Sequence, residues 1–420
     1  MFFDLEVLIE GRKRVFRYEN VNTRVVDLST GKELLVKPQT FDYPKTTHKF
    51  DIDFSNIAIL FINLGLKCNF SCKYCHQNHF RETTQVANCT PEKARQLLKI
   101  LGSLPKLNMQ AISLWGGEPL VYWKSFKVLI PGLRELFPDK RISLTTNGSL
   151  LNDEILDFLS KYNIRFTISY DGKITNRDES IFDRKELVDS LRKLGMGLDI
   201  MTTQNRASIP IKAIREEFSQ MGLPLKSIST YSIARCNPFN RDQAQEILIP
   251  RDKCERHSQL IYEILHGQTD SLDLYKGLPY RFDYILGSFY TGQRLDSQSF
   301  TFCGNCNGSD VCIDCEGKIF NCMNIPIHVM GTLQNFKPVD TSKIFNFHYQ
   351  KKACLSCPYV TCCRGGCPLI HDDESVEFKV NCSNLKITAV PFFRTMIERI
   401  FGAYLKRIVR VSDGKVFGEW

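Results

Sequence analysis

Six strand-like segments alternate with helical segments between residues 55 and 235, and this alternation constrains the fold most. The strand-like runs are 57–63, 111–115, 141–146, 165–170, 198–203 and 227–232; the helical patterns are 91–102, 125–137, 153–161, 183–194 and 211–221. Strands joined through helices pair in parallel, because each helix returns the chain to the same edge of the sheet. The pattern predicts an α/β fold, a partial (β/α)6 barrel with its site at the carboxyl ends of the strands.

The segments around this core differ in character. A chain of 420 residues with 43% hydrophobic residues has room for two or three domains. The expected division is a small N-terminal β-rich segment at 1–54, the core at 55–235, a bridging region at 236–300, a cysteine-rich domain at 301–385 and a C-terminal helix and tail at 386–420. Apolar periodicity predicts helices over 252–265 and 389–408.

The first strand-like run leads into Cys68, Cys72 and Cys75, a CxxxCxxC sequence. Three thiolates on one short loop can hold three irons of a [4Fe–4S] cluster, and the fourth iron is left open to bind a small molecule. A zinc site is the alternative, but structural zinc sites usually combine two closely spaced pairs and close at four ligands. The spacing therefore favours the cluster.

Polar loops follow the next three strands. They are Gly116-Gly117-Glu118-Pro119, Thr145-Thr146-Asn147-Gly148 and Ser169-Tyr170-Asp171-Gly172. Each alone is ordinary turn chemistry, but together they occupy one rim of the barrel, and paired glycines let a backbone approach a ligand closely. The candidate cofactor-binding residues are Tyr74, Gly116, Gly117, Glu118, Pro119, Thr146, Asn147, Ser169 and Asp171.

With these motifs, residues 57–235 resemble the radical S-adenosylmethionine (SAM) enzymes, which have a TIM-like partial barrel. The resemblance implies that a [4Fe–4S] cluster on the cysteine loop binds SAM and cleaves it to a 5′-deoxyadenosyl radical, which removes hydrogen from a substrate C–H bond. It also implies that Tyr74 lies near the adenine and that the Gly116–Pro119 turn contacts the methionyl amine. Ser169 or Asp171 would reach the ribose or the carboxylate.

Most of the 17 cysteines lie between Cys303 and Cys382. Their spacing resembles the SPASM extension of radical SAM enzymes, which implies two auxiliary clusters and so three [4Fe–4S] clusters in total. The implied ligands are Cys303, Cys306, Cys322 and Cys367 for the first auxiliary cluster, with Cys312 as an alternate, and Cys354, Cys357, Cys363 and Cys382 for the second. Cys315 and Cys362 are then surplus, and Cys89, Cys236 and Cys254 are expected to be plain thiols. A zinc ribbon is the alternative for this domain.

SPASM enzymes mostly modify ribosomally made peptides, so the resemblance to ribosomal-peptide (RiPP) maturases predicts a peptide-modifying oxidoreductase. The expected product is a side-chain cross-link such as a C–C or C–O cyclophane, made on a precursor peptide with a leader, with flavodoxin or ferredoxin as reductant. Alternatives are a thioether-forming, oxidising or epimerising maturase, a sulfatase-maturase-like enzyme, an enzyme acting on a small metabolite, and a non-catalytic electron-transfer protein.

Three details bear on the substrate. Sulfatase-maturing relatives place an Asp directly after the cysteine that corresponds to Cys322, whereas Met323 and Asn324 follow here. This disfavours formylglycine formation. The catalytic base stays open among candidates such as His76, Asp310 and Asp314. Residues 1–54 are expected either to bind a leader by strand addition or to cap the barrel.

Composition excludes several partners. No run of 18 apolar residues and no secretory signal occurs, which predicts a cytoplasmic protein without a membrane partner. The net charge of +9 comes from 55 basic and 46 acidic residues without a dense Lys/Arg block, so a nucleic-acid partner is not expected.

Overall fold

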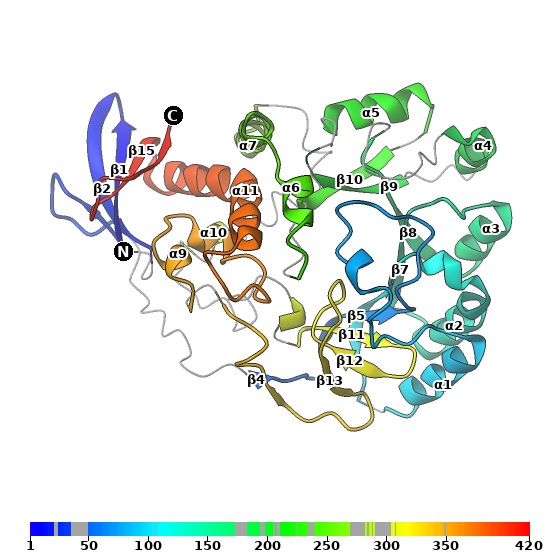
Figure 1. Ribbon diagram of the computed structural model, residues 1–420. Coiled ribbons are helices and arrows are strands. Elements are labelled where there is room, and N and C mark those ends of the chain that lie inside the picture. The colour runs from blue at the N-terminus through cyan, green and yellow to red at the C-terminus, as the bar shows by residue number, and fades with distance from the viewer. Residues whose placement is uncertain are drawn as a thin grey trace. The chain divides into compact units, whose positions relative to one another are not determined.

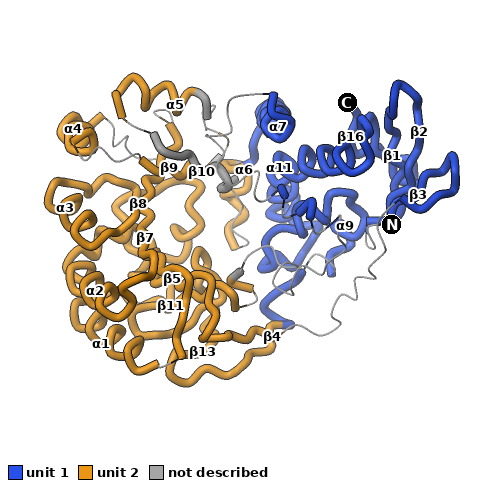
Figure 2. The backbone as a smooth tube through the Cα atoms, turned by 180° about the vertical axis from the view of Figure 1, so that it is seen from behind, with its two compact units in different colours: residues 1–48, 248–302, 342–420 blue, residues 49–247, 303–341 orange. Residues whose placement is uncertain are grey.

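The computed structural model describes most of the chain in two compact units (Figures 1 and 2). Unit 1 comprises Met1–His48, Leu248–Phe302 and Ser342–Trp420, and unit 2 comprises Lys49–Ile247 and Cys303–Thr341. The described residues are 1–20, 24–34, 49–104, 106–172, 183–193, 198–204, 206, 211–223, 225–233, 239–268, 282–283, 285–287, 289, 304–306, 308–347 and 350–420. Each unit collects segments distant in sequence, whereas the predicted division into five domains is linear and stays a prediction.

Unit 2 is built on a sheet of nine strands in the order β10-β9-β8-β7-β6-β5-β11-β12-β13. Its first six members are parallel neighbours and follow the predicted runs: β5 (Ile57–Asn63), β6 (Met109–Trp115), β7 (Arg141–Thr146), β8 (Ile164–Ser169), β9 (Leu198–Gln204) and β10 (Leu225–Ile233). β5 is apolar on both faces, and Ile57, Leu60 and Ile62 are fully buried. Such strands need cover on both sides, as in parallel sheets wrapped by helices.

Helices join these strands as expected. They are α1 (Pro91–Gly102), α2 (Trp123–Leu136), α3 (Asp153–Lys161), α4 (Lys185–Lys193) and α5 (Ile211–Gln220). Thr90 caps α1 by accepting a hydrogen bond from the Lys93 amide (3.3 Å), and Asn152 caps α3 through the Ile155 amide (2.9 Å). The predicted partial (β/α)6 barrel is confirmed, and the carboxyl ends of its strands share one rim.

The cysteine-rich segment extends the same sheet. β11 (Asp310–Asp314) pairs in parallel with β5, and β12 (Lys318–Phe320) and β13 (Val329–Thr332) continue the sheet antiparallel. Cys312 therefore lies in the core, fully buried in one apolar cluster with Phe61, Val86 and Phe320. The sequence did not predict this pairing, because it joins strands about 250 residues apart and leaves no local signal.

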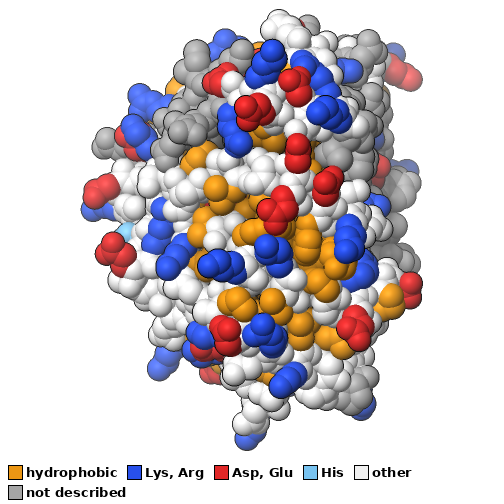
Figure 3. All heavy atoms as spheres, turned by 90° about the vertical axis from the view of Figure 1, so that its right-hand side faces the viewer, with side chains coloured by type: hydrophobic (Ala, Val, Ile, Leu, Met, Phe, Trp, Pro, Cys, Tyr) orange, Lys and Arg blue, Asp and Glu red, His pale blue; other side chains and the backbone are white. Residues whose placement is uncertain are grey.

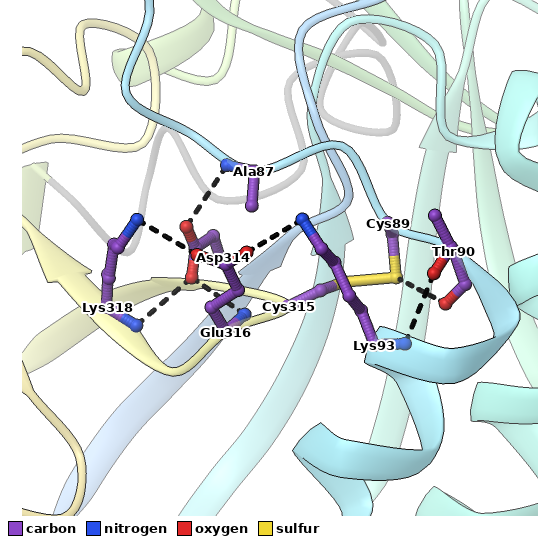
Figure 4. Close-up of polar contacts among 8 residues, drawn as sticks. All are labelled: Ala87, Cys89, Thr90, Lys93, Asp314, Cys315, Glu316 and Lys318. Carbon is purple, nitrogen blue, oxygen red and sulfur yellow. Dashed lines mark hydrogen bonds and ion pairs between the residues drawn. A yellow bond between two sulfur atoms is a disulfide. The ribbon is translucent and has the colours of Figure 1, made fainter.

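A disulfide joins Cys89 to Cys315 within unit 2, with 5.5 Å between their Cα atoms (Figure 4). Cys89 lies just before α1 and Cys315 directly follows β11. The Asp314 carboxylate beside it accepts a hydrogen bond from the Ala87 amide (3.1 Å). The expectation of a plain thiol at Cys89 was wrong, because the β5–β11 pairing brings together residues 226 positions apart. Cys315, which was expected to be surplus to the cluster ligands, is its disulfide partner.

Loss of this disulfide is expected to destabilise the protein. Replacing Cys89 and Cys315 by serine should lower the free energy of unfolding by roughly 2–5 kcal/mol, because the bond closes a long loop in the unfolded chain. Thermal unfolding with and without a reductant measures the effect. The double variant should show no reductant dependence, and a midpoint equal to that of oxidised wild type would contradict the prediction.

Unit 1 contains an antiparallel sheet in the order β16-β15-β1-β2-β3, in which both ends of the chain take part. Its strands are β1 (Phe2–Ile9), β2 (Arg12–Glu19), β3 (Arg24–Asp27), β15 (Tyr404–Arg410) and β16 (Val416–Glu419). The helix predicted over 389–408 is instead α11 (Val376–Phe401), which ends at Gly402 in the left-handed conformation (φ 59°). Leu405 and Ile408, taken for helical positions, are buried residues of β15. The apolar spacing typical of a helix continues past Gly402, so the sequence pattern did not reveal that the helix ends there.

The remaining elements are short, except α7. They are β4 (Lys49–Phe50), β14 (Val339–Asp340), α6 (Gln243–Ile247), α7 (Arg251–Leu265), α9 (Lys352–Leu355), α10 (Val360–Cys363) and the 3-10 helices Asn78–Phe80, Pro119–Tyr122 and Gly304–Cys306. Within the described ranges no helix is both long and apolar enough to cross a membrane. On the face in Figure 3, basic and acidic side chains are interspersed with apolar ones.

Candidate functional site

A cavity of about 400 Å³ in unit 2 collects most of the predicted cofactor-binding residues. Of those predicted, it is lined by Cys68, Cys72, Tyr74, Cys75, Gly116, Gly117, Glu118, Thr146, Asn147 and Ser169. Pro119 and Asp171 do not line it. The lining also includes Phe70, His76, Gln77, Arg81, Trp115, Thr145, Met201, Thr203, Met323 and Asn324. The cysteine loop and the loops after β6, β7 and β8 thus face one space.

The cysteine loop suits an iron–sulfur cluster. The sulfur of Cys68 accepts hydrogen bonds from the Phe70 amide (3.3 Å) and the Asn147 side-chain amide (3.9 Å), the kind of contact that tunes thiolate clusters. Burial raises the pKa of Cys68, and the nearby Arg81 cation opposes that shift. Among the described side chains no three His, Cys, Asp or Glu converge on a single metal ion. A cluster instead takes thiolates on separate irons, so ligands spread around a cavity fit it.

The two glycines of the Gly116–Pro119 turn allow close packing on the cysteine loop. A Cβ atom on Gly116 would lie 2.4 Å from the Gly65 carbonyl oxygen, and one on Gly117 would lie 2.3 Å from the Lys67 carbonyl oxygen. The Gly117 amide donates to the Gly65 oxygen (2.9 Å) and the Glu118 amide to the Lys67 oxygen (2.9 Å). These two amides therefore hold the cysteine loop in place.

Glu118 joins the loops after β6 and β7. Its side chain is buried, and its Oε1 accepts from the Thr146 hydroxyl (2.8 Å) and the Leu120 amide (3.0 Å). Its Oε2 accepts from the Asn147 amide (2.7 Å). Because Asn147 also contacts the Cys68 sulfur, this carboxylate positions a partner of the proposed cluster ligand.

Asp171 links the cysteine loop to β9 in the same way that Glu118 links its two loops. It is fully buried, its Oδ2 accepts from the Tyr74 hydroxyl, and its Oδ1 accepts from the Thr203 amide (2.7 Å). Tyr74 and Thr203 both line the cavity. Asp171 thus orients lining residues from behind, while Ser169 faces the cavity itself.

The loop after β12 completes the lining. Met323 and Asn324 face the cavity directly after Cys322, and the Gln77 side-chain amide donates to the Met323 carbonyl oxygen (3.2 Å). Apart from cysteine and tyrosine, the ionisable side chains among the lining residues described are His76, Arg81 and Glu118. Sequence reasoning missed Arg81 and Gln77, although both follow the third cysteine within six residues.

The three candidate bases lie in different places. His76 lines the cavity. Asp314 does not, and its carboxylate accepts hydrogen bonds from the amides of Ala87 (3.1 Å), Glu316 (2.9 Å) and Lys318 (3.0 Å). Asp310 pairs with Ile59 near the start of β5, away from the carboxyl ends of the strands. Of the three, His76 is therefore the one whose side chain lies at the cavity.

Asp310 is expected to make stability depend on pH. Burial raises its pKa from 3.8 to about 6, so the folded state binds more protons between these values and stability falls as pH rises through that window. Asp310→Asn removes the buried charge and should therefore raise the free energy of unfolding at pH 7.5. Because the side chain is only half-buried, solvent limits this gain to about 1–2 kcal/mol. Denaturation at pH 7.5 and pH 4 tests this; an equal gain at both would contradict it.

A second cavity, in unit 1, gathers cysteines from 354 to 382. It is lined by Cys354, Cys357, Cys363, Cys367 and Cys382, with mostly apolar neighbours. Burial raises the pKa of Cys354 to about 12 and that of Cys363 to about 11. Neighbouring thiols lose their protons when they bind a metal cation as thiolates, because the cation balances their negative charge. This donor set therefore fits an iron–sulfur cluster. Cys362 does not line the cavity.

The other predicted auxiliary ligands are divided between the units. Cys306, Cys312 and Cys322 lie in unit 2, Cys367 lies in unit 1, and Cys303 lies outside the described residues. Cys312 is fully buried and, next to burial, the Cys322 thiol is the main influence that raises its pKa. The first auxiliary cluster therefore stays a prediction.

Comparison with known proteins identifies the barrel. Residues 62–207 match the Radical SAM superfamily. The radical SAM cyclopropyl synthase TigE of Paramaledivibacter caminithermalis is 29% identical over 155 residues, 33% of this chain and 31% of TigE, so the match spans about a third of that relative. The cysteine-type anaerobic sulfatase-maturating enzyme of Clostridium perfringens is 22% identical over 367 residues, 76% of this chain and 91% of that enzyme.

A solved structure has a similar fold. "Native anSMEcpe with bound AdoMet and Kp18Cys peptide" has a TM-score of 0.57 at 17% identity and covers 82% of this chain and 99% of its own. At this identity the likeness concerns the fold alone. Together with the cysteine loop and the cavity beside it, the family match leads to one conclusion: residues 62–207 are a radical SAM domain.

Proposed function

We propose that this protein is a radical SAM peptide maturase that installs a side-chain cross-link, such as a cyclophane, in a ribosomally made precursor peptide. The observation that carries the proposal is the cavity into which Cys68, Cys72 and Cys75 face together with the loops after β6, β7 and β8. When bound there, the cluster and SAM would supply a 5′-deoxyadenosyl radical that abstracts hydrogen from the substrate. The protein's own residues would bind and orient the cofactor and the substrate, and they would exclude water from the cavity.

Several lining residues have a task within this proposal. Cys68, Cys72 and Cys75 would hold the cluster, and Ser169 and the backbone of the Gly116–Gly117 turn would bind SAM. The Arg81 cation, beside Cys68, suits a carboxylate of the cofactor or substrate. His76 lies directly after the third cysteine and would take the proton released when the substrate is oxidised.

A sulfatase-maturase-like function is the second candidate, favoured by the match over 91% of the Clostridium perfringens enzyme. The lining argues against it. Met323 and Asn324 follow Cys322 on the cavity, where the resemblance to those enzymes implies an Asp base. Among the described lining residues, the carboxylate present is Glu118, and three hydrogen bonds already occupy it.

The proposal extends to two auxiliary clusters of a SPASM domain, to a flavodoxin or ferredoxin as reductant, and to a cytoplasmic location. The edge of the unit 1 sheet at β16 is where a leader peptide would add a strand, since the outer side of β3 already pairs with residues 32–34. Reconstitution in the absence of air tests the cluster count: three clusters predict about twelve irons for each chain.

Incubation with a precursor peptide encoded beside the gene tests the function. The enzyme, SAM and a reductant should yield 5′-deoxyadenosine and a peptide lighter by two hydrogens for each cross-link. A peptide carrying a sulfatase target cysteine serves as the comparison. Conversion of that peptide alone would support the second candidate, and 5′-deoxyadenosine formation with neither peptide consumed would favour a small-molecule substrate.

A further inference from the structure

A buried lysine lies beside the cysteines of unit 1. The Lys351 side chain is 1% exposed, and its Nζ donates to the carbonyl oxygens of Cys367 (3.1 Å) and Gly365 (3.4 Å). The same ammonium lies 5.6 Å from the centroid of the Phe378 ring. None of these partners carries a full negative charge, and no ion pair joins Lys351 to a carboxylate of the described residues.

An uncompensated ammonium in such a place is costly, because burial removes the water that would solvate its charge. Burial lowers the pKa of Lys351. The groups that its Nζ contacts, on Gly365, Cys367 and Phe378, belong to residues that line the cavity shared by the cysteines from 354 to 382. The ammonium therefore lies against that cavity, where an anionic cluster would supply the negative charge that its present partners lack.

We propose that Lys351 is the built-in counter-ion of the [4Fe–4S] cluster held by Cys354, Cys357, Cys363 and Cys382, and that its charge raises the reduction potential of that cluster. The inference rests on the proposed auxiliary cluster. Reduction by a low-potential one-electron donor adds one negative charge to the cluster. A fixed cation in an apolar, dry surrounding stabilises that added charge more than a solvated cation does.

A second lysine offers a natural comparison. Lys386 lines the cavity, whereas Lys351 contacts residues that line it, but the Lys386 side chain is exposed, so water and salt screen its charge. Lys352, next to the buried lysine, is exposed and does not line the cavity. Removal of the charge at these positions should therefore change the potential in the order Lys351, Lys386, Lys352.

A purely structural role is the competing explanation. The two bonds from Nζ fasten the loop between Cys363 and Cys367, in which Arg364, Gly365 and Gly366 all have positive φ values (53°, 71° and 69°). A lysine that only held this loop would affect the amount of cluster assembled, but not the potential of the cluster that remains. The potential therefore separates the two roles.

The experiment is a redox titration of the full chain, followed by electron paramagnetic resonance. The titrated chain carries alanine at Cys68, Cys72 and Cys75, which removes the signal of the radical SAM cluster. Lys351→Met, Lys351→Gln, Lys351→Arg, Lys386→Met and Lys352→Met are compared, and iron is counted in each. Lys351→Gln keeps a hydrogen-bond donor without the charge, and Lys351→Arg keeps the charge.

Lys351→Met and Lys351→Gln should each shift the oxidised–reduced equilibrium at least tenfold toward the oxidised form, a fall of about 59 mV in potential. Lys351→Arg and Lys352→Met should shift it less than threefold. An unchanged potential in Lys351→Gln with full iron content would overturn the proposal, as would loss of the cluster from both neutral variants but not from Lys352→Met. Absence of any auxiliary signal in the parent chain would instead sink the proposed cluster itself.

Discussion

Replacing Cys72 by alanine is expected to abolish formation of 5′-deoxyadenosine from SAM. Cys72 is the most buried of the three loop cysteines, and its carbonyl oxygen accepts the Cys75 amide (3.0 Å), so the loop is built around it. Loss of a cluster ligand should exceed the 10–100-fold losses that follow removal of a ligand's hydrogen-bonding partner. Iron content, visible absorbance and 5′-deoxyadenosine, measured in the absence of air, give the answer.

Cys254→Ala is the matched control. Cys254 is half-buried on α7, its thiol contacts the Ile249 carbonyl oxygen (3.4 Å), and no cluster assignment includes it. This variant should keep its iron and its activity. Radical formation that persists in Cys72→Ala, with the iron content reduced to that of the auxiliary clusters alone, would remove the basis of the proposed function.

Replacing Glu118 by alanine should be the next most damaging change. It leaves the Leu120 amide, the Thr146 hydroxyl and the Asn147 amide without their acceptor in a buried site, and each unsatisfied donor costs about 1–3 kcal/mol. The free energy of unfolding should fall by roughly 3 kcal/mol, and SAM affinity should fall because the loops after β6 and β7 separate. Denaturation and SAM binding to the reconstituted protein measure these effects.

A graded series tests the geometry of Glu118. Thr146→Val removes one contact, while Glu118→Gln keeps the Oε1 acceptor but places an NH₂ group against the Asn147 amide. The losses of stability should rise from Thr146→Val through Glu118→Gln to Glu118→Ala. If Glu118→Ala lost only SAM affinity and no stability, the carboxylate would be a direct ligand of SAM rather than a link between loops.

Local sequence patterns predicted the barrel, because each of its strands and helices has a recognisable pattern of apolar and capping residues. Thr90 before Pro91 marks the start of α1, and the apolar run of β5 ends where the cysteine loop begins. Long-range pairings left no such signal. β11 beside β5, the Cys89–Cys315 bond and the union of β15 with β1 each join residues far apart in the chain. Only the folded chain reveals these partners.

The site likewise contains residues that the sequence could predict and residues that it could not. Residues on strand ends were predictable, since the carboxyl ends of parallel strands meet on one rim. Met323 and Asn324 reach that cavity only because β11 and β12 continue the barrel sheet. Glu118 and Asp171 were expected to touch the cofactor, but their hydrogen bonds show that they also fasten neighbouring loops. Composition cannot distinguish a ligand from the group that orients it.

The pairing of β5 with β11 also bears on how the chain is made. At about 5–20 residues per second, a ribosome needs on the order of tens of seconds to synthesise the chain between these strands. During that time one side of β5, an apolar strand, has no partner to satisfy its amides and carbonyls, and such an edge promotes aggregation. A shortened protein that stops before residue 310 would keep this open edge permanently. The isolated barrel should therefore aggregate far more readily than the whole chain.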